Sequence, residues 1–421
     1  MRVLFVHQNF PGQYKHLAPA IAAPKGNEVM ALCINVPPKL PGVPVWRYQV
    51  SRGTTPNVHP WVAETETKTI RGEACGRAAL QIRQRGFVPD VICAHPGWGE
   101  TLFLKDVFPE AKLLSFVEFH YGPTGRDMGF DPEFDSSGFE DFCRIRLKNA
   151  ANLLSLDLMD WGLSPTHWQA STVPAPFQPR LSVIHDGVDT DAVCPNPQAS
   201  ITLGRAGRLT AKDEVITFVN RNLEPMRGFH IFMRAIPEIQ ARCPQARIVI
   251  IGGDGVSYGR PPGEGKTWRQ VLLAELGDRI DLARVHFIGR VPYDQFLQVL
   301  QVSAVHVYLT YPFVLSWSML EAMSTGALVI GSATPPVMEV IEDGVNGLLV
   351  DFFDAPALAA AIARVLRHPD RMQTLRQKAR ETVQTRYDLR RICLPQHLAL
   401  VETLAAGRTP TPSPRPAGAL Q

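Results

Sequence analysis

Short apolar strands alternate with helix-compatible stretches along most of this chain. In the first half, each predicted strand is a mainly apolar run that is followed by a loop and by a stretch suited to a helix. Runs of this kind are typical of parallel strands whose two faces are both covered. Five such strands are predicted, over residues 2–7, 28–34, 90–94, 112–118 and 181–187.

The alternation restarts after a polar, proline-containing stretch over residues 195–210. Two series of similar size predict two doubly wound, Rossmann-like α/β domains that face a cleft, with ligands expected beyond the carboxyl ends of the strands. We expect domains over residues 1–195 and 196–385, and a disordered, proline-rich tail over 407–421. The second series of strands is predicted over residues 215–220, 246–252, 286–289, 304–309 and 327–331, and residues 356–406 are predicted to be helical.

The composition agrees with a two-domain enzyme. The length of 421 residues exceeds that of one ordinary core, and 45% hydrophobic with 20% charged residues is typical of a soluble globular enzyme. The net charge of +3 gives no reason to expect nucleic acid as a partner. The seven cysteines form no CxxC pair, which favours free thiols in a reducing compartment. No apolar run reaches transmembrane length and no signal-peptide pattern precedes the first strand, so a cytoplasmic protein is expected.

The segment over residues 313–332 says most about function. An apolar stretch ends at Ser316, a short helix follows, and Gly326 ends this helix before the next β-branched run. Ser316 or Ser318 is suited to cap the helix, whose first N–H groups and positive dipole end would then bind an anion. Glu321 lies about one turn further in, where its carboxylate suits a hydroxyl beside a bound phosphate. A phosphate together with a hydroxyl indicates a nucleotide.

Four other strand ends carry glycines or arginines. Gly12 permits close approach of the backbone to a phosphate or sugar, although a plain βα turn is the alternative. Arg221 and Arg227 follow the first strand of the second series, where two guanidinium groups suit a diphosphate leaving group; ordinary surface arginines are the alternative. Gly253 and Arg290 follow the next two strands, where backbone groups suit a base or a pyrophosphate.

Motifs in both halves of the chain occur in a characteristic order. The second half contains GGDG (252–255), FIGRVPYDQF (287–296), LEAMSTGALVIG (320–331) and EVIEDGVNGLLV (339–350). The first half contains HQNFPGQ (7–13), SPTHWQ (164–169) and VIHDGVDTD (183–191). In this number and order the motifs resemble those of retaining glycosyltransferases of the GT-B fold, family 4, and the resemblance covers nearly the whole chain.

The resemblance implies an activity and roles for individual residues. Members of this family transfer a sugar from a nucleotide donor with retention at the anomeric carbon and without a metal. Glu321 matches the glutamate that binds the ribose, and Gly12 matches the loop that approaches the donor. Arg221 and Arg227 match the basic pair on the donor phosphates. In the family a last helix crosses back onto the N-terminal domain, which implies that residues 386–406 do so here.

Two positions depart from the family pattern. Phe313 occupies the place of the first of two signature glutamates, which contacts the donor sugar. Sugar recognition would therefore use other groups, such as backbone amides near Ser316. The family also places a polar residue near the reacting carbon, and here Glu118 and His120 are both candidates. Either a carboxylate or an imidazole is suited to accept the acceptor proton or to hydrogen-bond the sugar.

Three further features have both a structural and a functional explanation. Trp98, which follows His95 at a strand end, suits stacking on an acceptor sugar, but a packed aromatic residue is favoured. Asp189 lies in a DTD sequence and is interpreted as a cap or hinge contact rather than a metal ligand. An arginine-rich stretch suits an anionic membrane surface, although a solvated helix face explains it as well. Its members are Arg71, Arg77, Arg83 and Arg85.

We therefore predict a metal-independent, retaining glycosyltransferase that uses a UDP- or GDP-linked sugar as co-substrate and no further cofactor. The acceptor is expected to be a hydroxyl of a glycan, a lipid-linked or a protein molecule, and peripheral contact with the inner face of the membrane stays open. A GT-B epimerase and a catalytically impaired nucleotide-sugar-binding subunit are the alternatives. The predicted catalytic residues are Glu118, His120, Arg221 and Arg227; the predicted donor-binding residues are Gly12, Gly253, Arg290, Ser316, Trp317, Ser318 and Glu321.

Overall fold

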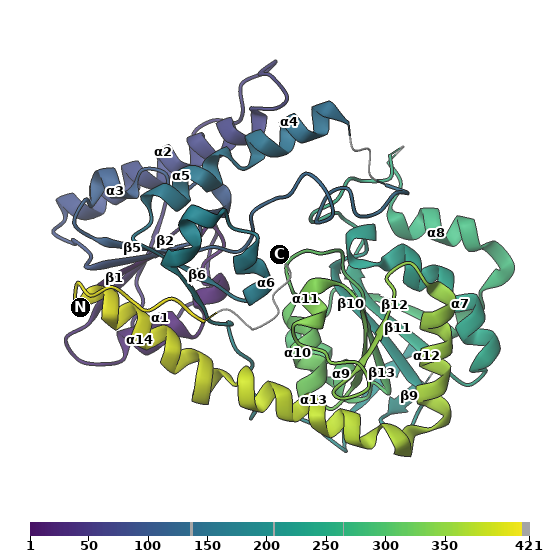
Figure 1. Cartoon of the computed structure of the whole chain (residues 1–421). Coiled ribbons are helices and arrows are strands. Elements are labelled where there is room, and N and C mark those ends of the chain that lie inside the picture. Colours follow the sequence, from purple (N-terminus) through teal and green to yellow (C-terminus); the bar gives the residue numbers. More distant parts are fainter. Residues whose placement is uncertain (135–137, 205–206, 264, 415–421) are drawn as a thin grey trace. The chain divides into compact units, whose positions relative to one another are not determined.

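The computed structural model describes residues 1–134, 138–204, 207–263 and 265–414. The chain divides into two compact units (Figure 1). Unit 1 contains Met1–Gly187 and the chain from Arg390 onward, and unit 2 contains Val188–Leu389. The division after residue 187 falls earlier in the chain than the expected boundary at 195.

Within the described residues, unit 1 holds a seven-stranded sheet in the order β3-β2-β1-β4-β5-β6-β7, with every neighbouring pair parallel. The order reverses between β1 and β4, which is the switch point of a doubly wound sheet. The strands are β1 (Arg2–Val6), β2 (Glu28–Cys33), β3 (Val45–Arg47), β4 (Val91–Ala94), β5 (Lys112–Phe116), β6 (Trp161–Ser164) and β7 (Leu181–Val183).

Helices cover both faces of this sheet, because successive strand residues point to opposite sides. Phe5 of β1 belongs to one core together with α1 and α14, while its neighbour Leu4 belongs to a second core with α2 and α3. The helices are α1 (Leu17–Ala22), α2 (Ala63–Gln84), α3 (Leu104–Val107), α4 (Phe139–Lys148), α5 (Ala150–Leu158), α6 (His167–Ser171) and α14 (Leu394–Ala405).

The last helix belongs to unit 1 although unit 2 precedes it in the chain. Helix α14 packs against α1 and buries Leu400, Val401 and Leu404 in the core beneath β1 (Figure 1). Burying a side chain of this size contributes about 2 kcal/mol, so the three side chains hold the helix firmly. The chain reaches α14 through a π-helical turn, η9 (Leu389–Cys393). A helix returning to the N-terminal unit agrees with the expectation for residues 386–406.

Unit 2 repeats the architecture with a six-stranded parallel sheet among its described residues, in the order β12-β11-β10-β13-β14-β15. A separate antiparallel pair, β8 (Ser200–Leu203) and β9 (Gly207–Thr210), precedes it. The sheet strands are β10 (Val215–Asn222), β11 (Arg247–Gly253), β12 (Val285–Gly289), β13 (Val305–Tyr308), β14 (Leu328–Ser332) and β15 (Leu348–Val350).

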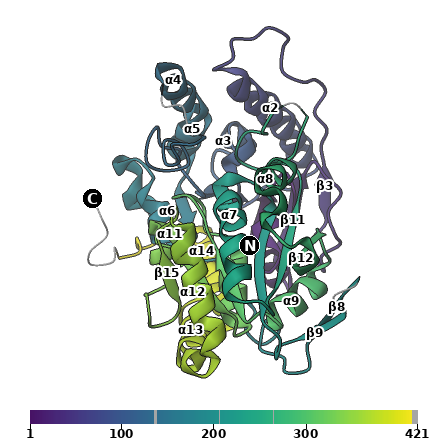
Figure 2. The same cartoon turned by 90° about the vertical axis from the view of Figure 1, so that its right-hand side faces the viewer.

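The helices of unit 2 also lie on both faces of its sheet. On one face Phe218 of β10 stacks on Phe232 of α7, and α7 lies beside α12 (Figure 2). On the other face Val215 and Val219 share a core with α9, α10 and α13. The helices are α7 (Phe229–Arg242), α8 (Trp268–Leu276), α9 (Tyr293–Gln301), α10 (Trp317–Ser324), α11 (Pro335–Met338), α12 (Ala355–Arg367) and α13 (Gln373–Arg386).

The proline-rich tail differs in part from the expectation of disorder. Over residues 407–414 the chain returns to the edge strand of unit 1, where the N–H of Val183 donates to Oγ of Ser413 at 2.8 Å. The N–H of Ser413 in turn donates to the carbonyl of Leu181 at 3.3 Å. Prolines are suited to such a sheet edge because only alternate residues there need a donor. Residues 415–421, for which disorder is also predicted, lie outside the described residues.

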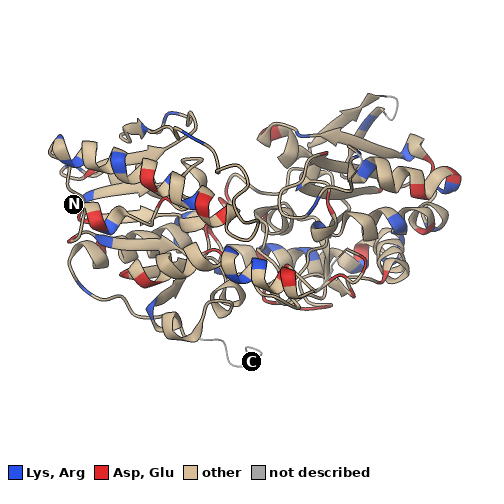
Figure 3. Ribbon diagram, turned by 90° about the horizontal axis from the view of Figure 1, so that it is seen from above, with Lys and Arg blue, Asp and Glu red and all other residues tan. Residues whose placement is uncertain are grey.

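Basic and acidic residues are interspersed along the helices of both units (Figure 3). The arginine-rich stretch, for which a solvated helix face is favoured over a membrane surface, is largely engaged in local contacts. Arg77 pairs with Glu73, Arg83 donates to the carbonyl of Val107, and Arg85 covers the ring of Trp46. Among the described residues, none of the helices combines the length and the hydrophobicity needed to cross a bilayer.

Candidate active site

The functional segment of unit 2 begins where β13 ends. Ser316 precedes α10, and its Oγ accepts the N–H of Ser318 at 3.4 Å, so Ser316 and not Ser318 is the cap. The N–H of Ser316 donates to the hydroxyl of the buried Tyr308 at 2.7 Å, which fixes the start of the helix. Trp317 is exposed and Ser318 is buried. The geometry therefore orients the amino end of α10 at the carboxyl edge of the sheet.

Glu321 lies one turn into α10 and is half-buried. The hydroxyl of Tyr293, the first residue of α9, donates to Oε1 of Glu321 at 2.6 Å. Burial and the neighbouring carboxylate of Glu321 raise the pKa of Tyr293, so the phenol stays a donor at neutral pH. Tyr293 holds the carboxylate in one orientation. Sequence reasoning missed this residue, although it lies within the FIGRVPYDQF motif.

Arg227 is fixed by contacts within unit 2. It ends η5 (Pro225–Arg227) with 6% of its surface exposed. Its Nη1 donates to Oγ1 of Thr310 at 2.9 Å and to the carbonyl of Val314 at 2.8 Å. The guanidinium also lies over the rings of Tyr258 and Phe313, at 5.3 and 5.5 Å from their centres. Held in this way, Arg227 retains a positive charge next to the loop that leads into α10.

Phe313, at the place of the expected glutamate, is part of this support. It is 2% exposed, and its ring meets that of Tyr258 at 4.9 Å and 63°. An aromatic face attracts a guanidinium and excludes water from it. The position therefore supplies packing against Arg227 instead of a carboxylate.

Glu224 was missed by sequence reasoning, and it organises the loop that carries Tyr258. Only 1% of Glu224 is exposed. Its carboxylate accepts the backbone N–H groups of Ser257, Tyr258 and Gly259, with shortest distances of 3.1, 3.2 and 2.9 Å. No local sequence pattern predicts this role, because the loop that Glu224 holds lies far from Glu224 along the chain.

The structure brings together Gly253 and Arg290, two of the predicted donor-binding residues. Nη2 of Arg290 donates to Oδ1 of the buried Asn222 at 2.8 Å, and Asn222 donates to Oγ of Ser257 at 2.7 Å. A Cβ at Gly253 would lie 2.7 Å from Oδ1 of Asn222 and 2.8 Å from Nε of Arg290, so a larger residue would displace these two side chains. Arg221, by contrast, is exposed and lies within β10 instead of just past it. The expected arginine pair is therefore unequal, with Arg227 alone built into the site.

In unit 1, the Gly12 loop is built on His7. Gly12 has φ +48°, and a side chain there would overlap the imidazole of His7. Nδ1 of His7 accepts the N–H of Asn9 at 3.0 Å, so its Nε2 donates to Oε1 of Gln13 at 2.9 Å. Burial, with a smaller effect of the neighbouring His95, lowers the pKa of His7 to about 3. The imidazole is therefore neutral and holds the loop in place.

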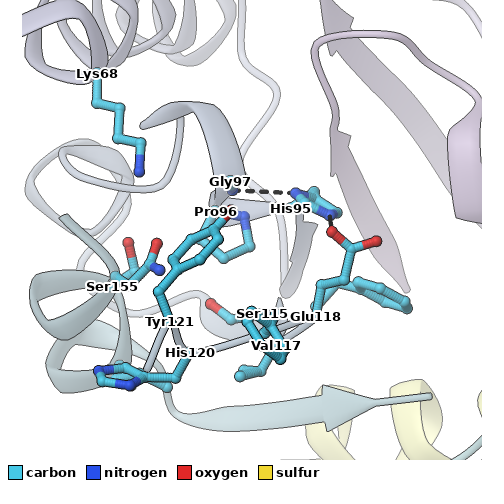
Figure 4. A pocket seen from close by; sticks show the side chains of 14 residues that line it. Lys68, His95, Pro96, Gly97, Ser115, Val117, Glu118, His120, Tyr121 and Ser155 are labelled. Carbon is cyan, nitrogen blue, oxygen red and sulfur yellow. Dashed lines mark hydrogen bonds and ion pairs between the residues drawn. The ribbon is translucent and has the colours of Figure 1, made fainter. Parts of the chain in front are cut away.

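His95 and Glu118 point toward each other across a narrow pocket at the ends of β4 and β5 (Figure 4). Nδ1 of His95 accepts the N–H of Gly97 at 3.1 Å, which leaves the proton on Nε2, 3.7 Å from Oε2 of Glu118. Trp98 packs against His95 with ring centres 4.7 Å apart, in agreement with a packed aromatic residue. The pocket measures only ≈ 50 Å³, room for little more than a water or two.

His120 points away from this pair (Figure 4). Burial, and to a lesser extent the charge of Arg126, lower the pKa of His120 to about 4. Its Nε2 is buried without a hydrogen-bond partner among the described residues. Of the two candidates for the polar residue near the reacting carbon, the structure brings Glu118 and not His120 to His95.

Asp189 makes a local turn contact by accepting the N–H of Ala192 at 3.3 Å.

Two parallel, doubly wound sheets with phosphate-suited groups at a strand edge define the GT-B class of fold. Solved structures agree over nearly the whole chain. Sucrose-phosphate synthase from Thermosynechococcus elongatus matches with a TM-score of 0.71 and 18% identity, over 96% of this chain and 100% of that one. Anabaena HepE in complex with UDP-glucose matches with a TM-score of 0.65 and 16% identity, over the same shares.

The chain belongs to the glycosyl transferases of family 4 and group 1. Residues 25–193 match the glycosyl transferase family 4 group, and residues 204–382 match glycosyl transferases group 1. A D-inositol 3-phosphate glycosyltransferase from Mycobacterium avium is 30% identical over 194 residues, which are 45% of this chain and 42% of the relative. The match therefore spans less than half of the length of that relative.

Proposed function

We propose that the protein transfers a sugar from a UDP- or GDP-linked donor to an acceptor hydroxyl, with retention of configuration and without a metal. Membership in the family supports the reaction class. The single observation that carries the donor site is Arg227, which is buried, charged and oriented by Thr310 and Val314. A cation fixed in this way lowers the barrier to departure of a diphosphate, because no reorganisation is needed as charge develops.

The groups around Arg227 suit the rest of a nucleotide sugar. The amino end of α10 after Ser316 suits the second phosphate, and the carboxylate of Glu321, held by Tyr293, suits the ribose hydroxyls. Gly253 and Arg290, joined through Asn222, suit the base. All of these residues belong to unit 2, so this unit is proposed to bind the donor.

In the proposed reaction the bond from the anomeric carbon to the diphosphate oxygen breaks, and a bond to the acceptor oxygen forms on the same face. The acceptor proton passes to the leaving diphosphate, which Arg227 stabilises. Glu118 is the carboxylate of unit 1 that suits a hydrogen bond to the sugar or the acceptor, and His95 orients it.

The seven free cysteines favour a reducing, intracellular location.

The donor site is tested by calorimetry with UDP, GDP and their sugars. We expect Arg227→Gln and Glu321→Gln each to weaken binding of the preferred nucleotide by about tenfold or more, the effect of one charge-assisted contact. Arg234→Gln is the matched control, because Arg234 lies on α7 of the same unit and pairs with Glu275 of α8. Equal affinity in all four proteins would contradict the donor site.

The reaction class is tested by product analysis. With donor and acceptor present, we expect a product that keeps the anomeric configuration of the donor, at a rate unaffected by a chelator. Incubation of the donor without an acceptor separates the alternatives. An epimeric sugar nucleotide would establish an epimerase, and tight nucleotide binding without any turnover would establish a binding subunit.

A further inference from the structure

A pocket of ≈ 330 Å³ in unit 1 has no role in the proposed donor site. It lies at the carboxyl ends of two neighbouring strands, since Gln8 follows β1 and Asn35 follows β2. The first half of α2, with Thr67 and Arg71, forms another wall, and the loop with Arg52 closes it. This edge of a parallel sheet is where α/β proteins bind ligands, and the volume suits one sugar-sized molecule.

The charge of the pocket is positive. Its described lining contains two arginines and no carboxylate. Arg52 is partly neutralised by Glu66, at 3.3 Å. Arg71 makes no hydrogen bond or ion pair with any described residue, in contrast to Arg77, which pairs with Glu73 on the same helix at 2.7 Å. A guanidinium left without a partner at a strand edge suits an anion.

Glu100 carries a carboxyl group that interacts electrostatically with Arg71 but is not its hydrogen-bonded partner. Glu100 is fully buried, and burial raises the pKa of its carboxyl group, which favours the neutral form. Its Oε1 accepts the hydroxyl of Tyr48 at 3.0 Å, and its Oε2 has no partner among the described residues. No ion pair or hydrogen bond joins Glu100 to Arg71 among the described residues, so the guanidinium stays available to the pocket.

The pocket also offers groups for hydroxyls. Oε1 of Gln8 is buried and has no hydrogen-bond partner among the described residues. Such an acceptor is costly to bury unless a donor reaches it, and a ligand hydroxyl would supply one. The amide of Asn35, which donates one hydrogen to Asn9, is exposed at the rim. A ligand that combines an anionic group with hydroxyls satisfies both Arg71 and Gln8.

We propose that this pocket binds a polyhydroxylated anion, a sugar or cyclitol unit that carries a phosphate or carboxylate group, and that this unit is the acceptor of the transfer reaction. Arg71 binds the anionic group and Gln8 accepts a hydroxyl. The assignment as acceptor rests on the proposed function, whereas binding of the anion does not.

Binding is tested by calorimetry on the full chain with glucose 1-phosphate, glucose 6-phosphate, glucuronate and glucose. We expect at least one of the three anions to bind at least about tenfold more tightly than glucose. Comparison of the two sugar phosphates with glucuronate shows whether phosphate or carboxylate is preferred. Arg71→Gln should remove most of this difference, about tenfold in affinity. Arg71→Lys should retain part of it, because the charge remains while the planar fork is lost.

Arg77→Gln is the control and should bind like the wild type. Glucose binding as tightly as every anion, no saturable binding of any anion, or unchanged affinity in Arg71→Gln would each overturn the proposal. Where Arg71→Gln does not fold, Arg71→Lys and the comparison of ligands on the wild type still decide it. UDP binding measured in parallel keeps the two proposals apart. Anion binding without nucleotide binding would sink the transferase, and nucleotide binding without anion binding would sink the pocket.

Discussion

The two units share a doubly wound fold but carry different chemical groups at the ends of their strands. In unit 2 the site is built around a permanent charge, because Arg227 is buried, hydrogen-bonded and covered by Phe313 and Tyr258. In unit 1 the strand ends carry two imidazoles, His7, which burial keeps neutral, and His95, which faces the carboxylate of Glu118. A fixed cation suits the charged leaving group of a nucleotide sugar, whereas imidazoles are suited to orient loops and hydroxyls.

The difference extends to what holds each site. Unit 2 uses a buried carboxylate, Glu224, to fix a loop through three backbone N–H groups. Unit 1 uses close packing, in which Gly12 lies directly on the imidazole of His7. The first kind of support fails when a charge is removed, and the second fails when an atom is added. Substitutions can therefore separate the two designs.

The largest effect is expected from Glu224→Ala. Removal of the buried carboxylate leaves a cavity and deprives the N–H groups of Ser257, Tyr258 and Gly259 of their charged acceptor, which should cost about 3–4 kcal/mol of unfolding free energy. Urea unfolding measures this. Glu238→Ala is the control, since Glu238 makes only an i,i+4 pair with Arg242 at the surface and should cost less than about 0.5 kcal/mol. Equal losses would show that the loop does not depend on Glu224.

The next effect is a pH dependence in unit 1. Because the folded pKa of His7 is about 3, below its usual value near 6.5, the unfolded chain binds the proton first as pH falls. The stability that neutral His7 contributes is therefore complete above pH 6.5 and is lost as pH falls from 6.5 toward 3. Over pH 6.5 to 4.5 the loss should approach about 3 kcal/mol.

The measurement compares wild type with His7→Gln by urea unfolding at several pH values in this window. The difference between the two curves isolates His7 from the other buried histidines, which titrate in both proteins. We expect the variant to lose stability less steeply, by about 1.4 kcal/mol per pH unit. Parallel curves would mean that His7 takes up its proton as easily in the folded protein as in the unfolded chain.

The sequence predicts the longer strands and helices better than it predicts the short strands or the residues that hold the functional loops. Long apolar runs such as the one that forms β10 are visible because both faces are buried. The strands β3 and β15 have three residues each, and β6 has four with a glycine, so no period is visible in them. Their place in the sheets follows from pairing with longer neighbours, which a local pattern does not contain.

The same limit applies to the sites. Arg227 and Glu321 lie in segments whose strand, turn and helix can be read along the chain, so both were predicted. Glu224 acts through a loop after β11 that the sheet brings to it. His7 holds a loop only a few residues further on, but its burial and its contact with His95 after β4 depend on the sheet. Local sequence shows that these residues are polar, and only the tertiary arrangement shows what they hold.

A smaller effect is expected from Gly12→Ala, which tests packing in unit 1. The methyl group would overlap the ring of His7, and φ of +48° is unfavourable for alanine. Gly26→Ala is the matched control, because Gly26 has φ +97° but nothing within 4 Å of the new carbon. We expect Gly12→Ala to lose about 2 kcal/mol more than the control in urea unfolding. Equal losses would indicate that the loop moves aside freely.

The smallest effect concerns the hydroxyl that orients Glu321. Tyr293→Phe removes the 2.6 Å hydrogen bond to Oε1 of Glu321 but leaves the ring on Phe296 in place. Nucleotide affinity should fall by about fivefold, or ~1 kcal/mol, with little change in stability because Tyr293 is only half-buried, with 52% of its surface exposed.

A double-mutant cycle with Glu321→Gln separates orientation from a direct contact of the phenol with the nucleotide. If Tyr293 acts by orienting the carboxylate, its removal should cost much less in the Glu321→Gln background, since there is no carboxylate left to orient. An undiminished loss in that background would mean that Tyr293 itself binds the nucleotide. The second result would make Tyr293 a nucleotide-binding residue and not one that only positions Glu321. The donor site of unit 2 would then also use an uncharged ring, which would reduce the difference between the two units.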